Sequence, residues 1–235
     1  MNIDINSAPI GGLIRSLNQP INKPAPHSLV PPLVCDTIHS MPILDHFGLF
    51  APHYDRVFKP GERGWLLGLV NLPENGTLLD VGGGTGRLAQ LFTNQSDQVV
   101  VADLSFEMLQ QTQLKEKLLP LQTASEFLSF PTESFDRILM VDALHHVIDH
   151  QETANELWRV LKPGGYIVIE EPDVRTFGVK LLAIAEKIMG MRSHFLSPAK
   201  IAALFEIFPA QTRIEKNTDN FNAWVIITKP STLTP

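Results

Sequence analysis

The sequence has little cysteine, no excess of positive charge and no long run of apolar residues. Cys35 is the single cysteine among 235 residues, which excludes a disulfide framework within the chain and a metal site built from several thiolates. The formal net charge of −6 argues against a nucleic-acid partner, because proteins that neutralise phosphates usually carry a basic stripe. No apolar run approaches the roughly 18 residues that a membrane-spanning helix needs. The first 30 residues also lack the basic start and apolar middle of a secretory signal. We therefore expect a cytoplasmic protein that spans no membrane.

The composition of the chain is that of one globular domain preceded by a flexible arm. With 44% hydrophobic and 19% charged residues, the chain is long enough to bury a proper core. Residues 1–34 contain six prolines among asparagine, serine and glycine, a composition that resists both helix and sheet. We interpret residues 1–34 as a flexible proline-rich arm and residues 35–235 as the domain.

Apolar runs that alternate with helical stretches set the fold class. Four runs end near an acidic residue and are apolar on both faces, which is typical of a parallel sheet covered by helices on both sides; they span residues 77–81, 98–103, 135–144 and 166–171. A helix is expected over 61–72, where Pro73 ends it. Residues 212–216 and 221–229 read as strands joined by a polar turn, so the last strand should be antiparallel. The sequence thus predicts an α/β, Rossmann-like, doubly wound sheet of seven strands with helices on both faces.

A helical insertion interrupts this alternation at residues 172–196. It is longer than the usual connection between a strand and a helix, and it follows a strand end, where open α/β folds bind ligands. Its apolar stripe recurs at helical spacing and contains Leu181, Leu182, Ile184, Ala185, Ile188 and Met189. The stripe is interpreted as a lid over an apolar acceptor, as ordinary core or as the surface of a homodimer.

The stretch LLDVGGGTGRLA, residues 78–89, is a strand that runs into a glycine-rich turn. Gly82, Gly84 and Gly86 have the spacing GxGxG, and Arg87 stands where a dinucleotide fingerprint has its last glycine. Asp80 ends the strand just before the turn, where its carboxylate would repel a pyrophosphate and attract a cation. These two features argue against a nicotinamide oxidoreductase.

A second carboxylate indicates the other half of the ligand. Asp103 lies 21 residues beyond Gly82 at the end of the next strand, from which an acidic side chain binds the hydroxyls of a ribose. An adenosine that carries a sulfonium and an ammonium meets both requirements. The alternative is that the turn serves helix packing and that Asp80 and Asp103 are solvated strand ends.

These residues resemble the class I S-adenosylmethionine-dependent methyltransferases, and more narrowly the branch similar to the ubiquinone/menaquinone biosynthesis enzymes that acts on small molecules. The resemblance is carried by FAPHYDRVF, LLDVGGGTGRLA, VVVADLSFEML, FPTESFDRILMVDALHHV, RVLKPGGYIVIEEPD and NAWVIITK, about four fifths of the chain. The family implies S-adenosyl-L-methionine as cofactor and a small-molecule methyl acceptor.

The resemblance also implies roles for single residues. Asp80 and the backbone at Gly82, Gly84 and Gly86 would hold the methionine part of the cofactor. Asp103 would bind the ribose hydroxyls, and Leu104 would pack on the adenine.

Two positions depart from the family pattern. Where relatives carry an acidic residue that reaches the adenine amino group, this chain has Ala124 followed by Ser125, so backbone groups or Ser125 would make that contact. Asp142, where many relatives have a small residue, would touch either the methionine amine or the acceptor.

The chemistry of methyl transfer favours two further candidates. If the acceptor is a hydroxyl or an acidic carbon, a histidine can serve as base, and His145 is preferred over His146 for this role. The alternative is that both histidines start and pack a helix. Tyr54 would fold an N-terminal helix over the cofactor, or would anchor that helix as a buried aromatic residue. Glu170 and Glu171 are expected to bound the pocket, and no metal site is expected because no cluster of histidine or cysteine accompanies them.

Two functions therefore remain. The first is S-adenosylmethionine-dependent methylation of a small, apolar or aromatic metabolite. The second is a protein of the same fold that binds the cofactor as a regulatory or interaction subunit, or that uses the cofactor without methyl transfer.

Overall fold

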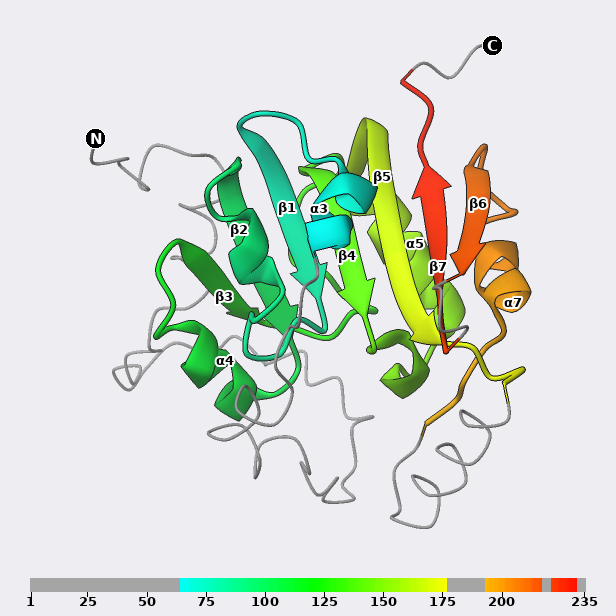
Figure 1. The fold of residues 1–235 in the computed structure, drawn as a ribbon, viewed down its shortest axis with the longest axis horizontal. Coiled ribbons are helices and arrows are strands. Elements are labelled where there is room, and N and C mark those ends of the chain that lie inside the picture. Colours follow the sequence, from blue (N-terminus) through cyan, green and yellow to red (C-terminus); the bar gives the residue numbers. More distant parts are fainter. Residues whose placement is uncertain (1–63, 177–192, 217–220, 232–235) are drawn as a thin grey trace, which may run out of the picture.

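The computed structural model describes residues 64–176, 193–216 and 221–231, which build one seven-stranded sheet of order β3-β2-β1-β4-β5-β7-β6 (Figure 1). Its strands are β1 (Gly76–Val81), β2 (Ser96–Asp103), β3 (Leu118–Gln122), β4 (Phe135–Val141), β5 (Leu161–Pro172), β6 (Gln211–Lys216) and β7 (Asn222–Thr228). The first five strands pair in parallel, and β7 runs antiparallel to both β5 and β6. The predicted fold class is confirmed, including the antiparallel last strand.

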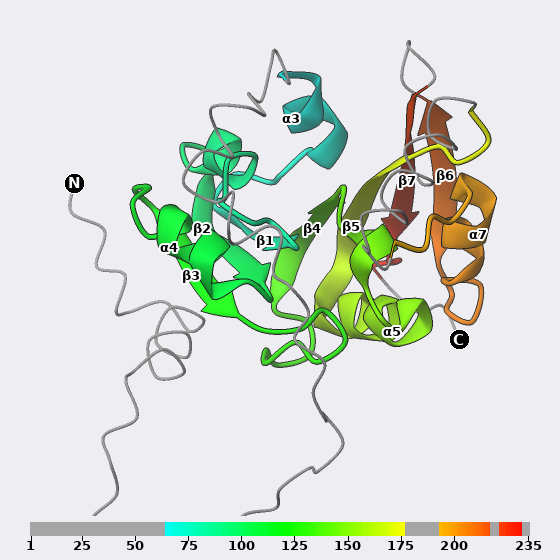
Figure 2. The ribbon, with the colours of Figure 1, turned by 90° about the horizontal axis from the view of Figure 1, so that it is seen from below.

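Helices cover both faces of the sheet, as Figure 2 shows in the view from below. The helices are α3 (Gly64–Val70), α4 (Phe106–Thr112), α5 (His150–Val160) and α7 (Pro198–Ala203), with 3-10 turns η1 (Ala89–Phe92) and η2 (Leu144–His146). Asp149 caps α5 by accepting hydrogen bonds from the N–H groups of Gln151 and Glu152, both at 3.0 Å.

The sheet has a hydrophobic core on each face because its central strands are apolar on both sides. In β2, Val100 and Ala102 face the core that α5 and α7 cover, whereas Val99 and Val101 face the core with α3, α4 and η1. A strand buried on both faces gives a continuous apolar run in place of alternation. This arrangement leaves the carboxyl ends of the strands as the edge on which side chains can meet a ligand.

The prediction missed the strand β3 and placed the end of β4 and the start of β5 differently from the structure. β3 was not among the predicted runs, because Pro120 interrupts it; proline is tolerated there because β3 is an edge strand. β4 ends at Val141 because Asp142 adopts a positive φ of 51° and begins the turn into η2. β5 starts at Leu161, which pairs with Phe135 before a register shift.

Several predictions concern residues outside the described ranges. They are the predictions for the arm of residues 1–34, for Tyr54 and for residues 177–192 of the insertion. The helix expected over 61–72 is described from Gly64 to Val70.

Within the described residues, no helix combines the length and the apolar character that crossing a membrane would require.

Candidate functional site

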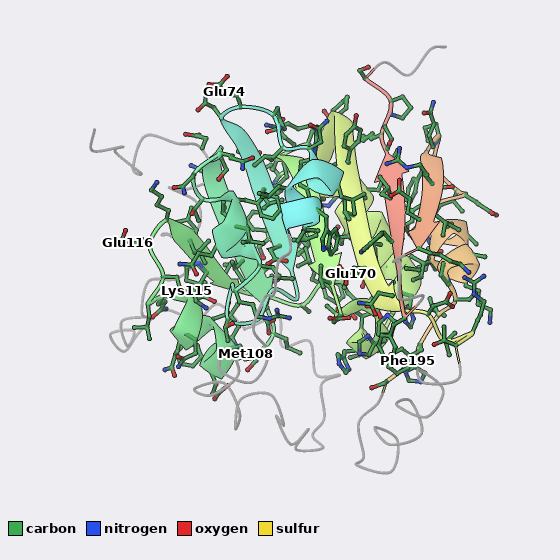
Figure 3. All side chains as sticks on the ribbon, in the orientation of Figure 1. Glu74, Met108, Lys115, Glu116, Glu170 and Phe195 are labelled. Carbon is green, nitrogen blue, oxygen red and sulfur yellow. The ribbon has the colours of Figure 1, made fainter. Side chains whose placement is uncertain are left out.

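The predicted site residues meet at the carboxyl edge where the order of the parallel strands reverses. From β1 the chain proceeds through β2 to β3 on one side, and then returns to β4 and β5 on the other. Open α/β sheets bind ligands at such a switch point. In Figure 3, Met108 and Phe195 lie at this lower edge, on either side of the ends of β1 and β4.

The glycine turn contains three positive φ angles, and its glycines lie against different neighbours. The φ values are 67° at Gly82, 56° at Gly84 and 72° at Gly86. A Cβ on Gly82 would overlap Cβ of Ala143, and one on Gly86 would lie 2.7 Å from Cδ1 of Leu118. A Cβ on Gly84 would meet only the flexible methyl end of Met108, at 3.3 Å, and Asp103 Oδ2 at 3.9 Å. Gly82 and Gly86 therefore serve close packing, and Gly84 occupies the more open position.

The N–H groups of this turn are used within the protein. Those of Gly82 and Gly83 donate to Ala102 O at 2.7 and 3.3 Å, and that of Gly86 donates to Gly83 O at 2.9 Å. The N–H of Gly84 donates to Asp103 Oδ2 at 2.8 Å. An anion held at such a turn needs backbone donors. The turn is thus poor in donors for a pyrophosphate and better suited to a cation.

Asp80 supplies a buried carboxyl beneath this turn. Its side chain is 2% exposed, and Oδ2 has no hydrogen-bond partner among the described residues. A Cβ on Gly83 would lie 2.6 Å from that oxygen, so the carboxyl lies directly against the Gly83 backbone. The pKa of Asp80 is raised to about 7, mainly by burial and also by the nearby Asp103, while Arg87 and a hydrogen bond from the Ala89 backbone partly offset both. A buried carboxyl with one unpaired oxygen is stabilised by a ligand with positive charge.

Asp103 is held rigidly at the end of β2. Its Oδ1 accepts a hydrogen bond from the N–H of Ser105 at 2.8 Å, while Oδ2 binds the glycine turn. The N–H of Thr123 donates to the Asp103 carbonyl at 3.0 Å. A carboxylate fixed at this strand end has the chemistry to accept hydrogen bonds from two adjacent hydroxyls.

Two exposed apolar side chains follow the neighbouring strands β2 and β3. Leu104 follows β2 and is 65% exposed, and its carbonyl accepts a hydrogen bond from Gln122 Nε2 at 3.0 Å. Phe127, in the loop after β3, is 73% exposed. Sequence reasoning singled out Leu104 and missed Phe127, although an apolar residue after β3 was the signal available.

The structure turns the Ser125 hydroxyl toward α5. Ser125 Oγ lies 3.3 Å from Thr153 Oγ1 and donates to Glu126 Oε2 at 3.2 Å. Glu126 in turn accepts the N–H of Ile148 at 2.8 Å, which ties the loop after β3 to the loop after β4. The side chain of Ser125 is therefore occupied with structural contacts, and its backbone is the better candidate for an adenine contact.

Asp142 lies at the end of β4 in a left-handed backbone conformation. Its φ is 51°, and its N–H donates to Glu170 O at 3.0 Å. Positive φ is uncommon for a residue other than glycine and is often found at functional sites. The geometry places Asp142 at the switch point, next to β1.

A buried pair of His145 and Glu171 connects β5 with η2. Nδ1 of His145 lies 2.6 Å from Oε2 of Glu171, and the two side chains are each 5% exposed. Oε1 of Glu171 accepts the N–H groups of Ala143 and Leu144 at 3.0 and 2.7 Å. Sequence reasoning placed Glu171 only at the pocket boundary, although the adjacency of β4 and β5 was the signal that could have paired it with His145.

His146 is a weaker base than an ordinary histidine. Burial, and to a smaller extent the adjacent His145, lower the pKa of His146 to about 3. His146 is thus neutral near physiological pH. No group of three or more His, Cys, Asp or Glu in the described parts of the chain has an arrangement that could hold a metal ion.

Comparison with known proteins identifies a similar family and similar relatives. Residues 79–169 match a family described as a methyltransferase domain. The ubiquinone/menaquinone biosynthesis C-methyltransferase UbiE of Geotalea daltonii is 33% identical over 146 residues, which cover 55% of this chain and 62% of that protein. The chain therefore spans less than two thirds of that curated relative.

Two solved structures share the fold. An S-adenosylmethionine-dependent methyltransferase from Thermotoga maritima has a TM-score of 0.64 and 24% identity, with 78% of this chain and 98% of that chain covered. The 4+2 cyclase SpnF has a TM-score of 0.60 and 16% identity, with 72% and 80% covered. At these identities, the likeness shows the fold alone.

Proposed function

We propose that this chain carries a class I S-adenosylmethionine-dependent methyltransferase domain and that it transfers a methyl group to a small, apolar or aromatic metabolite. The observation that supports this most is the buried carboxyl of Asp80, whose Oδ2 has no hydrogen-bond partner in the described structure. It lies against a glycine turn whose N–H groups are already used. A positively charged ligand fits that position, and the family implies S-adenosyl-L-methionine as cofactor.

The residues at the switch point fit the parts of this cofactor. Asp80 and the turn at Gly82, Gly84 and Gly86 would hold the methionine part. Asp103, held by the N–H groups of Gly84 and Ser105, would bind the ribose hydroxyls. When bound, the cofactor supplies a methyl group activated by a positively charged sulfur.

The remaining predicted residues would surround the adenine and the acceptor. Leu104 would pack on the adenine, and the backbone at Ser125 would contact its edge, because the hydroxyl is bound to Thr153 and Glu126. Asp142 would contact the methionine amine or the acceptor, and Tyr54 would cover the cofactor. These residues align the reactants and exclude water, which is the main requirement of an in-line displacement.

The proposal also covers the partners of the protein, its cellular compartment and its oligomeric state. The negative net charge supports a small-molecule acceptor and no nucleic-acid partner. The single cysteine supports a reducing cytoplasm, and the apolar stripe of the 172–196 insertion supports a homodimer or a lid. The name of the UbiE relative adds that one protein of this kind methylates carbon in quinone biosynthesis.

A labelled-transfer experiment tests the proposed function. The full chain is incubated with methyl-labelled S-adenosylmethionine and a small-molecule extract from its source, and the products are separated by mass spectrometry. We expect label in a small, apolar or aromatic product. Label in no product, or only in products that are neither apolar nor aromatic, would contradict the proposal.

A second function is favoured by one comparison. Because a cyclase shares this fold, the fold by itself does not require methyl transfer. A regulatory subunit, or a protein that uses the cofactor in another way, would bind S-adenosylmethionine and leave the extract unlabelled.

A further inference from the structure

We propose that the face of the sheet beside α3 carries a second binding site, a pocket that takes the phosphate or carboxylate group of a small metabolite. The pocket has a volume of about 210 Å³. One wall comes from α3 and the turn after it, with Gly68, Leu69 and Asn71, and the rest comes from β5, β6 and β7, with Tyr166, Arg213, Ile226 and Thr228. This site goes beyond the proposed function, because it shares no residue with the predicted cofactor site.

The register of the last three strands explains why these side chains meet. Tyr166 of β5 lies opposite Thr228 of β7, and Arg213 of β6 lies opposite Ile226 of β7. Residues opposite each other in a ladder share one face of the sheet, as do alternate residues of one strand. Ile226 belongs to the core with α3, so all four side chains are on the α3 face. Figures 1 and 2 show α3 on one face of the sheet and α5 on the other.

The pocket is separate from the carboxyl edge of the parallel strands. Tyr166 precedes Glu171 by five residues along β5, which corresponds to about 16 Å at about 3.3 Å per residue. Its partner on the other side is Arg137, near the start of β4. The pocket therefore lies toward the amino ends of β4 and β5, away from the glycine turn that follows β1.

The polar groups around the pocket are mainly hydrogen-bond donors. Tyr166 and Thr228 bring hydroxyl groups, Asn71 brings a side-chain amide, and Arg213 brings a guanidinium. The described residues that line the pocket include no carboxylate. A guanidinium beside neutral donors suits a carboxylate or a phosphate. The volume is below the roughly 300 Å³ at which pockets for drug-sized ligands begin, so the ligand should be small.

The guanidinium of Arg213 remains available to a ligand. Its Nε lies 2.8 Å from Oε1 of Glu215, and the two side chains are 64% and 40% exposed. Exposed ion pairs contribute little to stability because water and salt screen them. An oxyanion in the pocket can therefore compete with Glu215 or bind the further N–H groups of the guanidinium.

A second positive charge lies behind the ring of Tyr166. The side chain of Arg137 is buried, and its guanidinium carbon is 4.1 Å from the centre of that ring. Its Nε donates to Val70 O at 2.9 Å, and its Nη2 donates to Asn71 O at 2.8 Å. These carbonyls end α3, where a helix carries partial negative charge that would repel an anion. Arg137 offsets that charge beside the pocket.

Gly68 is not required by the packing of α3. A glycine inside a helix is unfavourable relative to alanine, so it usually has a local reason. A Cβ on Gly68 would meet no atom within 4 Å. The glycine leaves the wall of the pocket low, and larger side chains fit there without a clash.

Titration of the full chain by nuclear magnetic resonance tests the proposal, with inorganic phosphate and succinate as separate probes at constant ionic strength. We expect saturable shifts of the amide signals of Gly68, Tyr166 and Thr228. Saturation by phosphate alone would identify a phosphate ligand, and saturation by succinate alone would identify a carboxylate. Saturation by both would support the oxyanion chemistry that the two share. No S-adenosylmethionine is present, so the result does not depend on the proposed function.

A charge on β6 provides the first matched pair of variants. Arg213→Gln should raise the Kd of the probe at least about tenfold, the range for losing a hydrogen bond to a charged group. Lys216→Gln removes the same charge from the opposite face of the same strand and should change the Kd by less than about twofold.

A charge at the rim provides the second matched pair. Gly68→Lys and Gly68→Glu add side chains of similar length and opposite charge at a position with free space. Gly68→Lys should lower the Kd of the probe and Gly68→Glu should raise it, each by about twofold or more at the distances expected across the rim. The melting temperature of both variants should not fall, because each replaces a helical glycine.

The outcomes separate the inference from the proposed function. No saturable shift with either probe, shifts confined to other parts of the chain, or an unchanged Kd in Arg213→Gln would overturn the inference and leave the proposed function untouched. If the Gly68 variants do not fold, the comparison of Arg213→Gln with Lys216→Gln decides. A wild type that binds an oxyanion here and transfers no methyl group would contradict the proposed function alone.

Discussion

At the scale of single residues, the site depends on carboxylates with different surroundings. Asp80 is buried, and its Oδ2 has no hydrogen-bond partner among the described residues, whereas Asp103 and Glu171 each accept at least two hydrogen bonds. We expect different roles from this difference: Asp80 would bind a cation, Asp103 would accept hydrogen bonds from a ligand, and Glu171 would hold the His145 ring. Each can be tested by one substitution.

Asp103→Ala should weaken the binding of S-adenosylmethionine by about 1.5 to 3 kcal/mol, the range for losing hydrogen bonds to a charged group. Isothermal titration calorimetry measures this as a rise of roughly ten- to a hundredfold in Kd. An unchanged Kd would remove Asp103 from the ribose site.

Gly84→Val should abolish cofactor binding while the sheet remains folded. The added Cβ meets only the flexible end of Met108 in the protein, so most of the side chain enters the predicted ligand space, although φ of 56° adds some strain. Gly86→Val is the matched control, because its Cβ would lie 2.7 Å from Leu118 Cδ1 and should lower the melting temperature instead. Normal binding by Gly84→Val would mean that the turn is purely structural.

Asp80 should make the stability of the cofactor-free protein fall as pH rises. Its pKa is about 7 in the folded protein and 3.8 in the reference state, so its contribution is complete below about pH 4 and is lost as pH rises through about 7. The loss is on the order of a few kcal/mol. Asp80→Asn should therefore gain melting temperature relative to the wild type between about pH 5 and pH 8. An equal difference in melting temperature at both pH values would refute the burial effect.

At the scale of elements, the sequence predicted the strands with a continuous apolar run and misplaced those with a local irregularity. The runs at β1 and β2 were visible because both faces of each strand are buried. β3 was missed because Pro120 breaks its pattern, and proline is tolerated there because β3 is the edge strand of the described sheet. The end of β4 was placed too late because the backbone of Asp142, a property of tertiary structure, turns the chain.

The site shows the same limit of sequence reasoning. Asp80 and Asp103 follow strands at fixed offsets, so sequence spacing could predict their proximity. The contacts of Ser125 with Thr153 and of Glu171 with His145 join residues 28 and 26 positions apart, and no local pattern indicates which partner each side chain chooses. Only the packing of β4, β5 and α5 determines those partners.

The insertion of residues 172–196 supports a prediction at this scale. If its apolar stripe shapes the acceptor pocket, the double substitution Leu181→Gln with Ile188→Gln should raise the acceptor's Michaelis constant, because an apolar acceptor would lose burial. Cofactor affinity, melting temperature and particle mass should hardly change. A loss of a few kcal/mol in stability would indicate core, and a shift to monomers in light scattering would indicate a dimer surface. A variant with full activity and an unchanged dimer would contradict all three interpretations.

At the scale of the whole molecule, the two cores pack on the two faces of the sheet, and the predicted site residues lie at one edge. The strand order reverses between β1 and β4, and there the glycine turn, Asp142 and His145 come from strand ends that are neighbours in space. The same topology would serve a dinucleotide, so the choice of ligand rests on the chemistry of the turn. Its used N–H groups and the carboxyl of Asp80 favour a cation over a pyrophosphate.

Calorimetric titration of the full chain with S-adenosylmethionine and, separately, with NAD tests this central claim most directly. The account predicts saturable binding of one S-adenosylmethionine per chain and no measurable heat with NAD. Tight binding of NAD without binding of S-adenosylmethionine would contradict it.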